Sequence, residues 1–192
     1  MSFLAAGLDH RVDAIVPAFT WHSLRQALFP QHQVVGVAQS PADVSPANRQ
    51  GVFKQRWASL LFSNAGGRPT PAEQESTGTD QLCGRFDPQL CRGYLAAAET
   101  GEADDELSKL LDESGLEDVV PAIKAPTLII QGEDDTLFPL DHADANFRGL
   151  PAATAATMKW VAGGHDAEIS VDPVVDDLEA WFGRYLMRDG SA

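Results

Sequence analysis

The strongest constraint on the fold is a regular alternation of segments in the last third of the chain. An uninterrupted apolar run at Leu128–Ile130 predicts a strand that is buried on both faces, as in a parallel sheet. We expect a helix at Leu140–Leu150, with Gly149 near its end, then a strand at 156–164 and a helix at 171–187. This order predicts βαβ units, and therefore an α/β protein with a parallel sheet.

The last of these segments shows the clearest helical signal. Asp172 is a candidate N-cap, and Pro173 falls in the first turn, where proline is tolerated. The apolar residues that recur at helical spacing on one predicted face are Val174, Val175, Leu178, Trp181, Phe182 and Tyr185.

The rest of the chain has a different character. Val12–Val16 is a short strand candidate that Pro17 closes. Between Thr20 and Pro121, loops rich in glycine and proline alternate with short helical stretches such as 93–100 and 103–114. Loop-rich inserts with helices of their own often act as lids or binding surfaces.

Composition excludes several classes of partner. The chain has 192 residues, and its 28 acidic against 14 basic side chains give a net charge of -14, which repels nucleic acid and anionic membranes. No window approaches the roughly 18 apolar residues of a membrane span, and the N-terminal residues lack a basic leader. We therefore expect a cytoplasmic protein without a membrane or nucleic-acid partner.

The two cysteines, Cys83 and Cys91, lie eight positions apart. A metal site would need more ligands, and no histidine is near them in the sequence. Free thiols are the expectation for a cytoplasmic protein, with a local disulfide as the alternative.

Titratable residues follow two predicted strands at the point where each strand ends. Asp134 and Asp135 come directly after Gly132, and His165 follows Gly163-Gly164. Since the carboxyl ends of neighbouring parallel strands meet at one rim, an aspartate and the imidazole are expected to pair there, where the carboxylate would orient the ring of a general base. The alternative is that Asp135 caps the following helix and His165 is a solvated turn residue.

These motifs carry a resemblance to a known superfamily. The stretches "IKAPTLIIQGEDDTLFPLDHADANFRGL" and "MKWVAGGHD" resemble the last third of an α/β-hydrolase, whose triad runs Ser, Asp, His along the chain. The G-x-x-D spacing then assigns the acid to Asp135 rather than Asp134. "AAGLDHRVDAIVPAFTWHSLRQALFP" resembles the segment after the nucleophile in the X-Pro dipeptidyl-peptidase and cocaine-esterase-like acyl esterases.

The resemblance implies an organisation and an activity. Residues 1–21 and 121–192 would form part of a hydrolase core, and residues 22–120 a helical cap that shapes the substrate pocket. The substrate would be a small-molecule ester or peptide, cleaved through an acyl-enzyme with Asp135 and His165 as acid and base and without a metal or cofactor.

Three aromatic residues are candidates for the substrate pocket, because aromatic side chains suit acyl and prolyl groups. They are Trp21, Trp57 and Phe62. The alternative for each is ordinary packing inside the cap.

One departure from the family pattern limits this interpretation. No serine of the sequence has glycine both two positions before and two positions after it, and Ser2 has no glycine beside it. We therefore expect the C-terminal portion of a hydrolase, inactive alone, or alternatively a non-catalytic binding module. Without the neighbouring strand, Val12–Val16 would form an open sheet edge, which predicts marginal stability or association with a second copy or a complementing chain.

Two further sets of polar residues are expected to be solvated. Asp141 and His142 could be imagined as metal ligands, but on a helix face such residues are usually in water. His10 is expected in a surface turn, and the acidic run at 102–107 on an exposed helical face.

Overall fold

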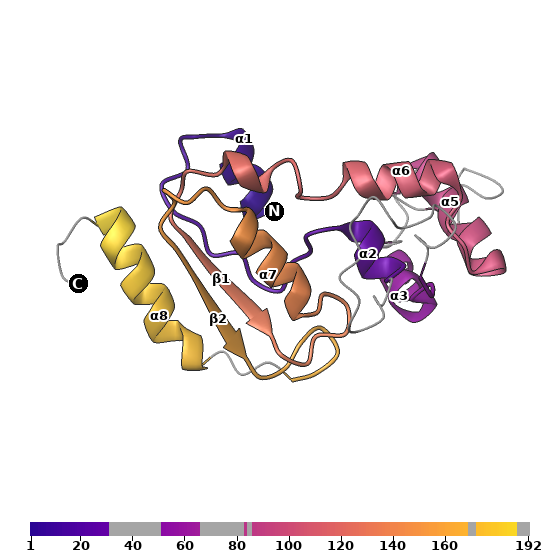
Figure 1. The fold of residues 1–192 in the computed structure, drawn as a ribbon. Helices are drawn as coiled ribbons and strands as arrows, with labels where there is room; N and C mark the ends of the chain where they lie inside the picture. The colour runs from indigo at the N-terminus through magenta and orange to yellow at the C-terminus, as the bar shows by residue number, and fades with distance from the viewer. Residues whose placement is uncertain (31–50, 66–82, 84–85, 169–171, 188–192) are drawn as a thin grey trace, which may run out of the picture. The chain divides into compact units, whose positions relative to one another are not determined.

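The computed structural model describes five stretches of the chain (Figure 1). They are residues 1–30, 51–65, 83, 86–168 and 172–187. The chain divides into two compact units, one formed by Met1–Ser23 with Gly115–Ala192 and the other by Leu24–Ser114.

The first unit contains a parallel pair of strands. β1 (Thr127–Gly132) and β2 (Ala156–Val161) run in the same direction, in a register that pairs the first residues of the two strands and likewise the last. α7 (Leu140–Gly149) connects them, as a parallel crossover requires. The predicted α/β class, the two strands and the helix between them are confirmed, and α7 ends at the predicted glycine.

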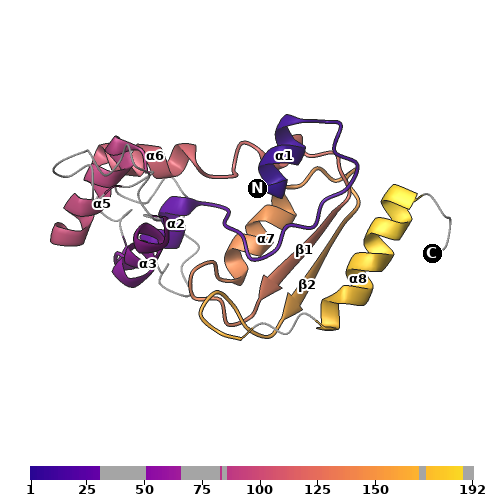
Figure 2. The same ribbon diagram turned by 180° about the vertical axis from the view of Figure 1, so that it is seen from behind.

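Helices cover both faces of β1. Ile129 packs in one apolar cluster with Ala143 of α7, whereas Leu128 and Ile130 pack in another with Val174 of α8 (Asp172–Phe182). Figure 1 shows α7 and α8 beside the two strands, and Figure 2 shows them from behind. Since successive side chains of a strand point to opposite faces, an unbroken apolar run suits this position.

The N-terminal helix α1 (Ser2–Leu8) completes the cluster on the α7 face. Phe3 and Ala6 lie about one turn apart and are buried against the 3-10 turn η4 (Val120–Ala122). The first residues of the chain therefore belong to the same core as β1.

The segment predicted as a strand at Val12–Val16 differs from the expectation. It runs parallel to β1, but only as isolated bridges from Ile15 to Thr127 and from Ala18 to Ile130. Pro17 between these bridges has no N–H to donate, so the ladder is interrupted and a continuous strand does not form.

The last helix confirms the predicted element but not every residue of its predicted apolar face. Val174 is buried, and Leu178 and Trp181 pack against the same cluster, whereas Val175 is 42% exposed. The apolar face of α8 that contacts the sheet is therefore narrower than the sequence predicts. The side chain of Asp172, the predicted N-cap, lies outside the described part of the structure. Lys159 of β2 forms an ion pair with Asp177 of α8.

In the second unit, the described residues form four helices. They are α2 (Leu24–Leu28), α3 (Gln55–Ala65), α5 (Pro88–Thr100) and α6 (Asp105–Glu113). An apolar core in this unit consists of Phe29, Ala97, Ala103, Leu107 and Leu111, with Leu24 and Leu28 of α2 packed against it. The two predicted helical stretches in this region are confirmed.

α5 begins earlier than its apolar pattern indicates. Asp87 is the N-cap, and its carboxylate accepts hydrogen bonds from the backbone N–H groups of Gln89 and Leu90. Pro88 occupies the first turn, where its missing N–H costs nothing.

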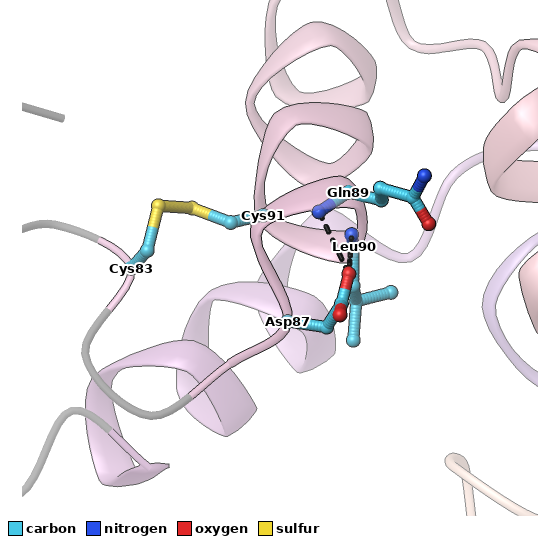
Figure 3. Close-up of a disulfide and its surroundings, with 5 residues drawn as sticks. All are labelled: Cys83, Asp87, Gln89, Leu90 and Cys91. Atoms are coloured by element: carbon cyan, nitrogen blue, oxygen red, sulfur yellow. Dashed lines mark hydrogen bonds between the residues drawn. A yellow bond between two sulfur atoms is a disulfide. The ribbon is translucent and has the colours of Figure 1, made fainter. Parts of the chain in front are cut away.

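The expectation of two free thiols is wrong in this structure. Cys83 and Cys91 form a disulfide, with their Cα atoms 5.5 Å apart (Figure 3). Cys91 lies on α5 one turn after its start and is fully buried. The disulfide therefore connects Cys83, which precedes the N-cap Asp87 in the sequence, to the first turn of α5.

Among the described residues, no helix has the length and apolar character needed to cross a bilayer.

Candidate acid–base site

The carboxyl ends of β1 and β2 are joined by backbone hydrogen bonds that continue past the strands. The N–H of Glu133 donates to the carbonyl of Val161 at 2.8 Å, and the N–H of Asp134 donates to the carbonyl of Gly163 at 3.1 Å. The loop after β1 and the loop after β2 are therefore held side by side where both strands end.

Glycine is required at this rim because the two loops approach so closely. A Cβ atom at Gly132 would lie 2.2 Å from the carbonyl oxygen of Gly163, and one at Gly164 would lie 2.4 Å from the Cα atom of Asp135. Gly163 also has a φ of 100°, which residues with a side chain rarely adopt. The backbone conformation therefore favours glycine at position 163, and the lack of space for a side chain requires it at position 164.

Asp135 and His165 are in contact across these loops. Nδ1 of His165 lies 2.7 Å from Oδ2 of Asp135. Asp135 is buried, and the side chain of His165 is 32% exposed. Asp134, the neighbouring acid, is exposed.

The Asp135 carboxylate accepts hydrogen bonds at both oxygens. Oδ1 accepts from the backbone N–H groups of Leu137 and Phe138, each at 2.9 Å. Oδ2, besides its contact with His165, accepts from Nε2 of Gln131 at 3.3 Å. The loop therefore folds back on the carboxylate, and hydrogen bonds from several directions fix the position of the carboxylate in the site.

These contacts keep the buried carboxyl ionised. Burial of Asp135 opposes ionisation and by itself raises its pKa. The hydrogen bond from His165 and those from the amides of Phe138 and Leu137 together outweigh burial, so the pKa lies below its ordinary value. An ionised carboxylate can only accept, so Nδ1 of His165 carries the hydrogen and Nε2 of the neutral ring has the lone pair. This is the tautomer of a general base.

Two aromatic rings contact the imidazole of His165 edge to face. The ring centroid of Phe138 lies 5.1 Å from it and that of Phe19 lies 6.2 Å from it, with interplanar angles of 89° and 87°. Phe19 has a φ of 48°, which is uncommon for a residue with a bulky side chain, and its N–H donates to Ile130 at 2.9 Å. Backbone strain of this kind is often found at functional sites.

A polar pair links the two loops at their exposed side. The carboxylate of Asp166 accepts hydrogen bonds from the hydroxyl of Thr136 at 2.6 Å and from its N–H at 3.4 Å. Asp166 directly follows His165, and Thr136 directly follows Asp135. The residues that follow Asp135 and His165 are therefore also joined to each other by hydrogen bonds.

The aromatic candidates fall into the two units. Trp21 belongs to the first unit, where its ring lies 5.8 Å from that of Phe138, so one ring separates it from His165. Phe62 belongs to the second unit and stacks on Phe86 and Tyr94. Trp57 lies on the same helix as Phe62 and is half-buried.

His142 is not solvated, in contrast to the expectation from the sequence. It is buried, and its Nδ1 accepts the backbone N–H of His22 at 3.0 Å. Asn146 is one turn further along α7; it contacts Nδ1 of His22 at 2.9 Å and donates to the carbonyl of Trp21. Asp141 is exposed, as expected. Within the described ranges, no group of three His, Cys, Asp or Glu side chains is arranged to hold a metal ion.

Three residues around the pair were not singled out from the sequence. Gln131 directly follows the apolar run of β1, and a polar residue in a strand buried on both faces is a usable signal. Phe138 follows the acidic loop, but a phenylalanine there looks like any core residue. For Phe19, no local pattern predicts a positive φ.

The fold and site define an α/β protein with an aspartate–histidine pair at the carboxyl ends of two neighbouring parallel strands. No family model and no curated protein sequence matches the chain. Solved structures that resemble it include an acetyl xylan esterase from a Paenibacillus species, with 14% identity over 96% of this chain and a TM-score of 0.49. An acetylester hydrolase from Corynebacterium glutamicum has 15% identity over 94% and a TM-score of 0.42. A hydrolase from Pseudomonas aeruginosa has 17% identity over 96% and a TM-score of 0.40.

The chain is much shorter than these proteins. It covers 42% of the acetyl xylan esterase, 57% of the acetylester hydrolase and 59% of the Pseudomonas hydrolase. At such identities and TM-scores, the similarities carry no argument about activity.

Proposed function

We propose that this chain supplies the acid and the base of a serine-hydrolase triad. The observation that carries the proposal is the 2.7 Å contact between the buried Asp135 carboxylate and Nδ1 of the partly exposed His165. This contact sets the tautomer that a general base needs. The resemblance of the sequence to X-Pro dipeptidyl-peptidases and cocaine-esterase-like acyl esterases supports an ester or amide as the substrate.

The chemistry requires a serine hydroxyl next to Nε2 of His165. The serine oxygen attacks the acyl carbonyl carbon while its proton passes to Nε2, and the Asp135 carboxylate stabilises the imidazolium that forms. The imidazolium then returns the proton to the departing alcohol or amine, and an acyl-enzyme results. Water repeats the sequence and releases the acid.

The catalytic serine would be carried by an additional strand that pairs with the segment Val12–Val16. Ile15 uses both its N–H and its carbonyl for hydrogen bonds to the β1 side, so the backbone groups of Ala14 and Val16 point the other way. Within the part of the chain that the structure describes, no backbone hydrogen bond is present for these two residues. A strand that bears the nucleophile, from a longer chain or a complementing one, fits this edge.

Residues 22–120 are proposed as the cap that shapes the substrate pocket. Trp21 is proposed as a substrate contact in the first unit, because only the ring of Phe138 lies between it and His165. Trp57 and Phe62 are proposed as cap contacts to the substrate.

A fluorophosphonate probe tests the proposal, because it labels only an activated serine. We would compare the 192-residue chain with the same chain extended by the in-frame sequence encoded upstream of Met1. We expect no labelling and no cleavage of p-nitrophenyl esters by the shorter chain. The longer chain should label at a serine, and His165→Ala should abolish the labelling. Thr157→Val, at an exposed position of β2, is the control and should leave labelling intact.

Two results would contradict this function. One is strong serine labelling of the 192-residue chain, and the other is labelling of the extended chain that survives His165→Ala. If the upstream sequence has no G-x-S-x-G motif and neither preparation is labelled, a non-catalytic binding module derived from a hydrolase is favoured. The absence of this motif from the present sequence is the observation behind that alternative.

A further inference from the structure

Gln131 is a polar residue in a position where the fold expects an apolar one. It lies next to the last residue of β1, every residue of which is buried, and its exposed fraction is 0%. Burying an amide side chain is unfavourable unless hydrogen bonds replace those it made with water. The contacts of Gln131 therefore indicate why it is there.

The amide nitrogen of Gln131 contacts both ends of the loop that carries Asp135. Nε2 lies 2.7 Å from the carbonyl oxygen of Phe138 and 3.3 Å from Oδ2 of Asp135. Both partners can only accept hydrogen bonds, so the nitrogen of the amide, with its two hydrogens, must face them. This fixes the orientation of the side chain without ambiguity.

These contacts close the loop onto the strand. The N–H of Phe138 donates to Oδ1 of Asp135, while its carbonyl accepts from Gln131. Gln131 also donates to Oδ2, the same oxygen that contacts His165. The side chain of Gln131 thus holds the carboxylate from the rigid strand, while His165 contacts it from the neighbouring loop.

We propose that Gln131 is the positioning residue of the acid–base pair: its amide holds the Asp135 carboxylate in the orientation that receives the Nδ1 hydrogen of His165. This inference rests on the proposed function of the pair. Gln131 acts only through Asp135 and takes no part in the proton transfer.

The test follows the Nδ1 hydrogen of His165 by NMR in the 192-residue chain. A hydrogen shared with a buried carboxylate gives a resonance far downfield that exchanges slowly with water. Gln131→Met keeps the approximate volume but removes the donor. It should move this resonance upfield and accelerate its exchange about fivefold, the change expected for the loss of one hydrogen bond. Gln89→Met, at an exposed position of α5, is the matched control and should change neither quantity.

Gln131→Glu is a second variant of nearly the same shape. It places a carboxyl against Oδ2 of Asp135, so the two must share a proton, and the titration of Asp135 should move to higher pH. If like charges prevent folding at neutral pH, the variant should fold at acidic pH, where the introduced carboxyl is protonated and can still donate. Gln89→Glu adds the same charge on the surface and should leave the titration of Asp135 in place.

The outcomes separate this inference from the proposed function. If the unmodified chain has no downfield His165 resonance, the acid–base pair itself is wrong. If the resonance is present but both Gln131 variants leave it and the Asp135 titration unchanged, only the role of Gln131 is wrong. Failure of Gln131→Glu to fold at either pH also contradicts that role, because a protonated carboxyl preserves the donor.

Discussion

The backbone of Asp135 lies so close to Gly164 that a side-chain carbon on the glycine would be 2.4 Å from the Cα atom of the aspartate. This approach brings the loop of the acid within reach of the loop of the base. The contact between Asp135 and His165 therefore depends on a residue that takes no part in it.

Gly164→Ala should separate the two loops. The added methyl group overlaps backbone atoms, which cannot move aside as a flexible side chain can, and overpacking of this kind costs about 1–3 kcal/mol. We expect a lower free energy of unfolding and loss of the downfield His165 resonance. Gly183→Ala, with no atom within 4 Å of the added carbon, is the control; it should leave the His165 resonance in place and should not lower the free energy of unfolding. An unaltered His165 resonance in Gly164→Ala would show that the close approach is not needed.

The stability of the chain should decrease as the pH falls into the acidic range. The pKa of Asp135 in the folded chain lies below its ordinary value of about 3.8, so the unfolded chain binds a proton at a higher pH than the folded one. The stabilisation is fully present above the ordinary pKa and is lost as the pH falls through the folded value. Urea unfolding at a series of pH values should show a shallower dependence for Asp135→Asn than for the unmodified chain. The same substitution at the exposed Asp134 should keep the original slope.

The disulfide between Cys83 and Cys91 should stabilise the second unit against unfolding. It closes a loop of only a few residues, so its removal should cost roughly 2 kcal/mol, the lower end of the usual range. Thermal unfolding with and without a thiol reductant measures the effect. The double variant Cys83→Ala, Cys91→Ala should unfold at the lower temperature and should not respond to reductant. Identical curves for the oxidised and reduced chain would argue against a stabilising bond.

Thr136→Val should loosen the loop of His165 without disturbing the core. Valine keeps the shape of threonine but cannot donate to Asp166, and an exposed hydrogen bond of this kind contributes at most about 1 kcal/mol. We expect faster amide hydrogen exchange in the loop after β2 with almost unchanged global stability. Thr157→Val serves as the comparison because it makes the same change on an exposed strand residue. Equal exchange in both variants would contradict the role of this hydrogen bond.

The elements that the sequence predicts well are those with a strong local pattern. β1 is recognisable because a strand buried on both faces has an unbroken apolar run, here Leu128–Ile130, and the position of Asp135 and His165 follows from the rule that parallel strands end at one rim. The glycines of the second loop indicate a sharp exit from β2, although only the structure shows that Gly164 is required by the backbone of Asp135.

Two of the failures have a common cause, which is dependence on distant parts of the chain. His142 is buried because the N–H of His22, 120 positions earlier, donates to its ring. The interruption of the Val12–Val16 strand depends on which N–H groups face β1, and Pro17 occupies the position that matters. Neither partner is visible in a local window of sequence.

Phe19 faces two opposing requirements at a single position. Glycine would adopt the φ of 48° with ease but would remove the ring that contacts the edge of His165, whereas another large side chain would keep a wall there and retain the unfavourable backbone. Glycine therefore gains on one count and loses on the other, whereas a large side chain gains on neither. A tolerant response to Phe19→Gly would reflect compensation between the two, not a lack of importance.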